Sequence, residues 1–200
     1  MTISAAQIKE LREATGAGVL DCRKALESTD GDMQKAMAIL REKGLATAAK
    51  RADRVTLNGV VDLYSHGDGR VGVMVELNCE TDFVARTKEF RTFAHELSLQ
   101  VAAGSPRYVR PEDVPADVLE AERQKARDLA LQEGKPEKVV DRIIEGRLEK
   151  FYDEQCLLRQ VYIRDDAKKV GDLLQETIAS TGENIVIRRF ARWAVGEEIG

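Results

Sequence analysis

Residues 78–86 of the chain read NCETDFVAR, and the pattern of the sequence changes within them. Apolar side chains alternate before this stretch, as in a β-strand, and recur at helical spacing after Thr81 and Asp82. The stretch is therefore predicted to form a corner between a sheet and a helix, where Asp82 and Phe83 would place a carboxylate and an apolar ring on one small surface. Taken alone, it favours a more common alternative, in which Thr81 or Asp82 caps the helix and Phe83 faces the core.

The composition favours a helix-rich protein with a modest sheet. Hydrophobic residues make up 43% of the 200 and charged residues 33%, which is enough for a buried core and for long solvated helix faces. Aromatic residues make up only 5%, fewer than a β-sandwich or barrel would favour. The formal net charge of −4 lacks the basic excess that phosphate binding requires, so we expect no direct binding to nucleic acid.

Cysteine usage and hydropathy indicate a soluble protein of the reducing cytoplasm. Cys22, Cys79 and Cys156 are widely spaced and odd in number, so they predict neither a disulfide framework nor a zinc site. Residues 1–14 have helix-forming chemistry rather than the apolar segment of a signal peptide. No apolar run approaches the length that spans a membrane, so we expect no membrane partner.

Residues 1–45 are predicted to form a small bundle of three short helices. Ser4 and Gln7 fit a capping box at the start of the first helix. Asp32 can cap the third helix, and Gly44 is expected to end it. Such a bundle is near the lower size limit for independent folding.

Residues 46–54 carry almost no large apolar side chain and are predicted to be a linker, and residues 55–200 an α+β core with an antiparallel sheet. Within the core, two long charged helices at 117–152 flank a Gly-x-Pro break and predict an antiparallel helical hairpin. The first of these helices has only a thin apolar stripe, so the hairpin is expected to project from the core, as interaction devices do; lengthwise packing on the core is the alternative. The other predicted elements are paired strands at 55–64 and 71–77, a helix at 87–101, strands at 156–163 and 184–193, and a helix at 170–178.

Motifs for catalysis and nucleotide binding are missing from the sequence. Cys79 with His66 is the only conceivable pair of nucleophile and base, and it rests on proximity in a predicted hairpin alone. A buried cysteine and a turn histidine are the more common interpretation. The chain has no Walker or dinucleotide-binding glycine pattern and no EF-hand loop. We therefore expect a binding protein without a cofactor, a bound metal or a catalytic site.

Four segments resemble the bacterial elongation factor Ts family in content and order. They are TGAGVLDCRKAL at 15–26, GDMQKAMAILREKG at 31–44, NCETDFVAR at 78–86 and GKPEKVVDRIIEGRLEKF at 134–151. The resemblance spans essentially the whole chain, and the combination of the first and third segments is highly specific. It favours an outward orientation of Asp82 and Phe83.

The resemblance implies a guanine-nucleotide exchange factor for elongation factor Tu, the GTPase that carries aminoacyl-tRNA to the ribosome. In the family, the segment that corresponds to residues 81–84 enters the partner near the Mg²⁺ ion of the bound nucleotide. The residues that would bind elongation factor Tu in this way are Thr81, Asp82, Phe83 and Val84. Phe83 would act as a wedge, and Asp82 would offer a competing carboxylate.

The resemblance also implies that the N-terminal UBA-like bundle docks on the GTPase domain of the partner. The contact residues there would be Val19, Leu20, Arg23 and Lys24. The family often has two methionines where this chain has Val19 and Leu20, which keeps the apolar contact but changes its fit. Short members of the family have one copy of the core subdomain, as this chain does, and act as homodimers, so a homodimer is expected.

A pure interaction scaffold is the competing function. A UBA-like bundle joined to a helical hairpin could bind a partner without altering its nucleotide, and the bundle alone does not separate the two functions. The segment TDFVAR at residues 81–86 does distinguish the two functions, and its presence favours the exchange factor. Catalysis through Cys79 and His66 ranks third, and retained function in Cys79→Ala would exclude it.

Overall fold

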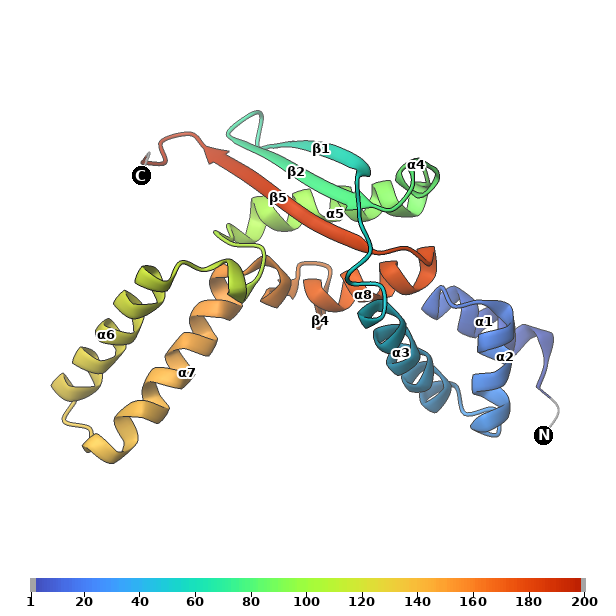
Figure 1. The fold of residues 1–200 in the computed structure, drawn as a ribbon, viewed down its shortest axis with the longest axis horizontal. Coiled ribbons are helices and arrows are strands. Elements are labelled where there is room, and N and C mark those ends of the chain that lie inside the picture. The colour runs from blue at the N-terminus through green and yellow to red at the C-terminus, as the bar shows by residue number, and fades with distance from the viewer. Residues whose placement is uncertain (1–2, 199–200) are drawn as a thin grey trace. The chain divides into compact units, whose positions relative to one another are not determined.

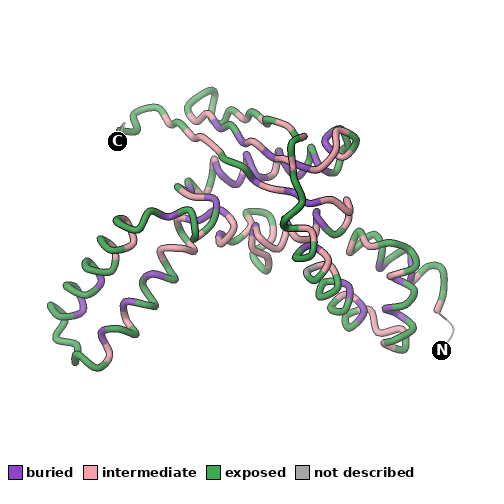
Figure 2. Tube along the Cα trace, viewed as in Figure 1, coloured by how far each residue is buried: buried purple, intermediate pink, exposed green. Residues whose placement is uncertain are grey.

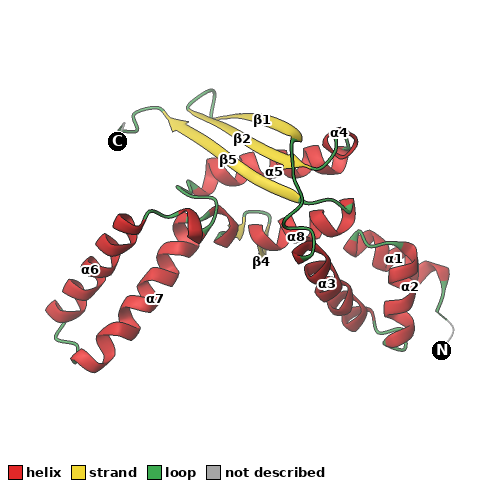
Figure 3. Cartoon of the chain, in the orientation of Figure 1, coloured by secondary structure: helices red, strands yellow, loops and turns green. Residues whose placement is uncertain are grey.

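The structure is a computed structural model that describes residues 3–198, in which helices and small antiparallel sheets combine in an α+β fold (Figure 1). Figure 3 separates the helices from the strands. The main elements are α1 Ala5–Thr15, α2 Val19–Ser28, α3 Met33–Ala49, β1 Asn58–His66, β2 Val71–Cys79, α4 Asp82–Ala85, α5 Lys88–Gly104, α6 Ala116–Gln132, α7 Glu137–Gln155, β3 Val161–Tyr162, β4 Asp165–Lys169, α8 Val170–Thr181 and β5 Ile185–Ala194. None of the helices within residues 3–198 is both long enough and apolar enough to cross a membrane.

The chain divides into two compact units. The first contains the residues up to 62 together with 75–96 and 172–188. The second contains 63–74, 97–171 and the residues from 189 onward. The first unit therefore holds α1 to α4, and the second holds the hairpin of α6 and α7.

Helices α1, α2 and α3 share one small apolar core, as the sequence predicted. The predicted capping box is confirmed: Ser4 Oγ accepts from the Gln7 N–H at 3.2 Å, and Gln7 Oε1 accepts from the Ser4 N–H at 3.0 Å. Gly16 ends α1 with a positive φ of 67°, which a glycine adopts without steric cost. The buried residues of this core are Ile8, Leu11, Cys22, Ala25, Leu26, Ala36 and Leu40.

Helix α3 is longer than predicted. Asp32 caps it as expected, by accepting from the Lys35 N–H at 3.0 Å, but Gly44 does not end it. The helix continues to Ala49 through residues that form helices well. Gly44 instead permits a close helix crossing, since a Cβ at this position would lie 3.1 Å from the Cβ of Ala179 in α8.

The larger sheet has the strand order β1-β2-β5. Strands β1 and β2 form the predicted hairpin around a turn at 67–70. Along β2, alternate side chains are buried. Helix α5 runs beside the sheet (Figure 1), and His95 Nδ1 lies 3.3 Å from Asp62 Oδ2 of β1. The apolar side chains buried along β2 and α5 are Val73, Val75, Leu77, Cys79, Phe90, Phe93, Ala94, Leu97 and Val101.

Helices α6 and α7 form the predicted hairpin, with Gly134 in the turn at a positive φ of 69°. The apolar stripe between them is narrow, and Figure 2 shows their outer faces exposed. Pro115 is the N-cap residue of α6, so no side-chain hydrogen bond caps this helix. The buried residues of the hairpin are Ala126, Ala130, Val140, Ile144 and Leu148.

The strand predicted at 156–163 is wrong. A 3₁₀ turn occupies Leu157–Arg159, and only Val161–Tyr162 forms a short strand, which pairs with β4. The reason is the side chain of Gln160, which is buried and donates to the backbone carbonyls of Gly104 at 2.9 Å and Glu154 at 2.8 Å. Tertiary hydrogen bonds thus override the local alternation of apolar residues.

Candidate partner-binding site

The corner between β2 and α4 forms where the change of period predicted it. Strand β2 ends at Cys79 and helix α4 begins at Asp82, so Glu80 and Thr81 connect the two. Thr81 is the N-cap of α4, and its Oγ1 accepts a hydrogen bond from the backbone N–H of Val84 at 3.4 Å. This confirms the predicted cap, which sets the start of the helix and therefore the directions of Asp82 and Phe83.

Helix α4 turns one side to the core and the other to solvent. Ala85 is buried and Val84 is half-buried, whereas Phe83 is 81% exposed. The interpretation in which Phe83 faces the core is therefore wrong, and the outward orientation is confirmed. Most of the apolar area of the ring remains available for burial against another molecule.

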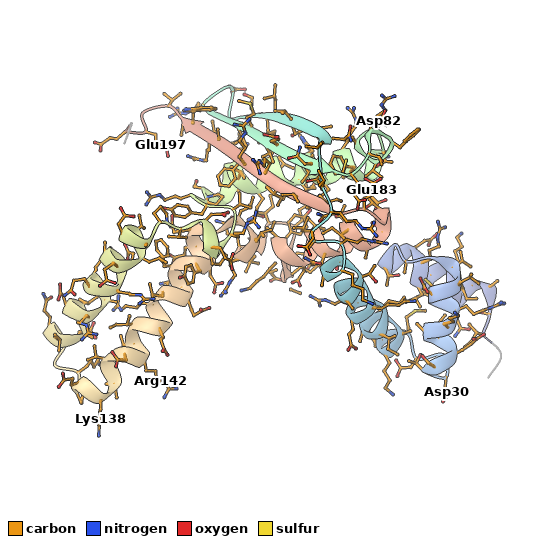
Figure 4. All side chains as sticks on the ribbon, viewed as in Figure 1. Asp30, Asp82, Lys138, Arg142, Glu183 and Glu197 are labelled. Atoms are coloured by element: carbon orange, nitrogen blue, oxygen red, sulfur yellow. The ribbon has the colours of Figure 1, made fainter. Side chains whose placement is uncertain are left out.

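Asp82 lies beside Phe83 on the same short helix (Figure 4). Its Oδ2 forms an ion pair with Arg86 Nη2 at 2.8 Å, one helical turn further along the chain. Both side chains are at least half exposed, so the pair is solvated and contributes little to stability. The carboxylate is therefore held by a partner that can be displaced at low cost.

An open pocket of about 230 Å³ lies between α4 and the start of β1. Gly59 allows β1 to approach β2 closely, because a Cβ at this position would lie 2.1 Å from the carbonyl oxygen of Leu77 in β2. The pocket combines a carboxylate with two guanidinium groups and is therefore suited to polar and charged groups. Its lining residues are Asn58, Gly59, Val60, Asp82, Ala85, Arg86 and Arg91.

The second predicted contact set lies in the first two turns of α2. Val19 is 55% exposed and Leu20 is 69% exposed, whereas most of the large apolar side chains of the bundle lie in or against its core. Arg23 and Lys24 follow on the same helix and are also exposed. The structure thus places the two sets on different elements of the first unit, and brings the apolar and basic side chains of α2 to the surface.

The cysteines are free and buried, and they do not form the nucleophilic pair considered from the sequence. Burial, with a contribution from the Glu183 carboxylate, raises the pKa of the Cys79 thiol to about 11, which keeps it protonated at neutral pH. His66 lies at the other end of the hairpin, next to the turn, and its Nδ1 is 2.9 Å from the Tyr64 hydroxyl. Burial likewise raises the pKa of Cys156 to about 11. Within residues 3–198, no group of three or more metal-ligating side chains comes together.

Sequence reasoning missed two features of the corner. The pair of Asp82 and Arg86 has the i, i+4 spacing of helical ion pairs and could have been found from that spacing. The hydrogen bonds that Glu183 makes to the backbone before α4 could not, because no local pattern connects it with Glu80, 103 residues earlier.

Comparisons with known proteins match the sequence of nearly the whole chain. A sequence model of the family described as Elongation factor TS matches residues 3–197. The chain is 62% identical to Elongation factor Ts of Thermoanaerobacter sp. (strain X514) over 197 residues, covering 98% of this chain and 97% of that protein. It is 57% identical over 198 residues to Elongation factor Ts of Thermotoga neapolitana, covering 99% of this chain and 100% of that protein. The chain therefore belongs to the elongation factor Ts family, a family of translation elongation factors.

Proposed function

We propose that this chain is a guanine-nucleotide exchange factor that promotes GDP release from elongation factor Tu by disturbing the Mg²⁺ and phosphate site of that GTPase. The observation that carries the proposal is the corner at α4, where an 81% exposed Phe83 lies beside the carboxylate of Asp82. The family of the chain supports the choice of partner. A scaffold that only binds would not require an exposed ring and a carboxylate side by side on one short helix.

The chemistry of the partner site explains why a small contact suffices. Mg²⁺ bridges phosphate oxygens and protein ligands in near-ideal octahedral geometry, so a slight displacement of its surroundings weakens the nucleotide. Phe83 acts as the wedge that displaces elements of the partner, and Asp82 competes for the polar groups that surround the ion. Thr81 and Val84 set the backbone of the contact, Thr81 through its capping hydroxyl.

The exchange factor needs no catalytic group or cofactor of its own, because the process it promotes is a dissociation. By thermodynamic linkage, a factor that weakens nucleotide binding is itself bound less tightly by the nucleotide-loaded partner, to the same extent. Fresh GTP then displaces the factor. Exchange is accelerated, and the equilibrium between nucleotides is unchanged.

The N-terminal bundle supplies affinity in this proposal. We take this bundle to be UBA-like; its three helices share one apolar core, and α2 presents Val19 and Leu20 as an exposed apolar pair. Arg23 and Lys24 place positive charge beside that pair, which suits a docking surface with acidic groups. Docking through α2 and displacement through α4 are separate tasks on one unit of the chain.

We propose further that the protein acts in the cytoplasm as a homodimer. Leu63 of β1 is 70% exposed and Met74 of β2 is 38% exposed. Each lies three residues from its end of the hairpin turn, so the two are opposite each other on one face of the sheet. A second copy of the chain would cover this apolar surface.

The test of exchange is the release of fluorescent GDP from elongation factor Tu. The wild-type chain should accelerate release, and Phe83→Ala should slow the accelerated rate by about thirtyfold or more, because truncating a central aromatic anchor typically costs about 2 kcal/mol or more. Leu131→Ala is the matched control, since it truncates another exposed apolar side chain, on α6, and should release GDP at the wild-type rate.

Two outcomes would contradict the proposal in different ways. A wild-type chain that binds elongation factor Tu but leaves GDP release unchanged would favour the scaffold. If Phe83→Ala and the wild type accelerate release equally, the exchange activity stands and the wedge role of Phe83 falls. Circular dichroism of each variant establishes that the fold is intact.

A further inference from the structure

We propose that Glu183 is a positioning residue, whose carboxylate fixes the backbone before α4 so that Asp82 and Phe83 meet the partner in a defined orientation. The inference rests on the proposed exchange function. Glu183 lies in the short connection between α8 and β5 and belongs to the same compact unit as the corner (Figure 4).

Both oxygens of the Glu183 carboxylate are used at the corner. Oε2 accepts hydrogen bonds from the backbone N–H groups of Glu80 at 3.1 Å and Thr81 at 3.0 Å. Oε1 accepts from the hydroxyl of Thr81 at 2.5 Å. Three donors therefore converge on one carboxylate, at the two residues that connect β2 to α4. Hydrogen bonds to an ionised acceptor are shorter and stronger than those between neutral groups.

The Thr81 hydroxyl transmits this contact to the helix. It donates to Glu183 and at the same time accepts from the backbone N–H of Val84, as the N-cap of α4. Helix α4 has only four residues, which is too short for a helix to be stable without outside support. The orientation of its first turn, which carries Asp82 and Phe83, thus depends on the chain of contacts from the carboxylate through the cap.

The support is reciprocal. The carboxylate of Glu80 accepts from the backbone N–H of Asn184 at 2.7 Å, so the two connections exchange hydrogen bonds. The buried side chain of Asn184 donates to the backbone carbonyls of Ala52 at 3.1 Å and Arg54 at 2.9 Å. The corner is thereby fixed to the segment that follows α3, the last helix of the bundle that carries the proposed docking residues.

A merely stabilising carboxylate would have the same contacts, so the experiment must separate position from stability. The measurement is GDP release from elongation factor Tu as a function of exchange-factor concentration, with Glu183→Gln. The amide keeps the shape of the side chain but offers only one acceptor oxygen, so it cannot accept all three hydrogen bonds. Glu145→Gln, at an exposed carboxylate of α7, is the matched control and should behave as the wild type.

We expect Glu183→Gln to lower the maximal rate of GDP release by about tenfold, the effect of losing one or two charge-assisted hydrogen bonds. The concentration that gives the half-maximal rate should change by less than about twofold, because the docking surface of α2 is intact. If Glu183→Gln does not fold, Thr81→Val removes one of the three donors and should lower the maximal rate in the same direction.

The decisive comparison repeats Glu183→Gln in a chain that already carries Asp82→Ala and Phe83→Ala. A residue that acts through those two side chains has little further effect once they are gone. Three results would each overturn the positioning role while the exchange function stands. In the first, Glu183→Gln lowers the release rate by the same factor with and without Asp82 and Phe83. In the second, Glu183→Gln changes only the half-maximal concentration, and in the third it is as fast as the wild type. A wild-type chain that does not accelerate release would overturn both.

Discussion

Asp82 and Phe83 are adjacent, but one carries a charge and the other an apolar ring, so exposure to water has a different energetic cost for each in the free chain. Phe83 keeps its ring in water at the cost of unburied apolar area. The Asp82 carboxylate forms an ion pair with Arg86 at 2.8 Å. The hydrogen bonds of Glu183 hold Asp82 and Phe83 in a defined orientation, so in this proposal they raise the maximal rate of GDP release without touching the partner.

The ion pair predicts how Arg86 modulates exchange. If the Asp82 carboxylate acts at the Mg²⁺ site, it must first leave Arg86, and Arg86→Ala removes that step. We expect GDP release to accelerate about two- to fivefold, the range that corresponds to an exposed ion pair. The free energy of unfolding should change by less than about 0.5 kcal/mol, as measured by urea titration.

Lys9→Ala is the control for Arg86→Ala, because Lys9 pairs with Glu13 at the same i, i+4 spacing on α1. It should leave both the release rate and the stability unchanged. Slower release by Arg86→Ala would instead mean that the guanidinium itself binds the partner. It would contradict a mechanism in which Arg86 and the Mg²⁺ site compete for the Asp82 carboxylate.

At this scale, the sequence could predict what is local and nothing more. The cap at Thr81 follows from residue type and from the change of period, and both are confirmed. The direction of Phe83 does not follow, because a ring next to a cap can face either way until the burial of Ala85 fixes the helix. Only the family resemblance favoured the correct orientation.

A helix or strand was predictable where its own apolar face decides how it packs. It was not predictable where a residue far away in the sequence decides its conformation. Helices α1 and α2 and the hairpin of α6 and α7 follow from apolar spacing and turn residues. Residues 156–163 do not form the predicted strand, because the buried Gln160 donates to the backbone carbonyl of Gly104, 56 residues earlier in the sequence. Gly44 does not end α3 as predicted, because its role is set by Ala179, on another helix.

The crossing of α3 and α8 gives a prediction for this element. Gly44→Val adds a branched side chain where even a Cβ would lie 3.1 Å from the Cβ of Ala179, so overpacking should destabilise the chain by about 1–3 kcal/mol. Gly146→Val on α7 is the matched control, because a Cβ there meets nothing within 4 Å. The control should change stability by less than about 0.5 kcal/mol. Urea unfolding of both variants measures the difference, and equal stabilities would contradict the close crossing.

For the molecule as a whole, the proposed tasks divide between the two units. The docking residues of α2, the corner at α4 and the supporting Glu183 all belong to the first unit. The hairpin of α6 and α7 and the exposed pair of Leu63 and Met74 belong to the second. The exchange contacts and the proposed dimer contact therefore do not compete for the same side chains.

The homodimer is tested by the mass of the particle in solution. Light scattering at micromolar concentration should give twice the chain mass of 22.2 kDa for the wild type. Leu63→Lys should give the mass of one chain, because a lysine ammonium buried opposite its own copy would be desolvated without a partner charge. Leu131→Lys, which charges an exposed leucine of the hairpin instead, should remain dimeric. A monomeric wild type would overturn the homodimer, whereas a dimeric Leu63→Lys would place the contact on another surface.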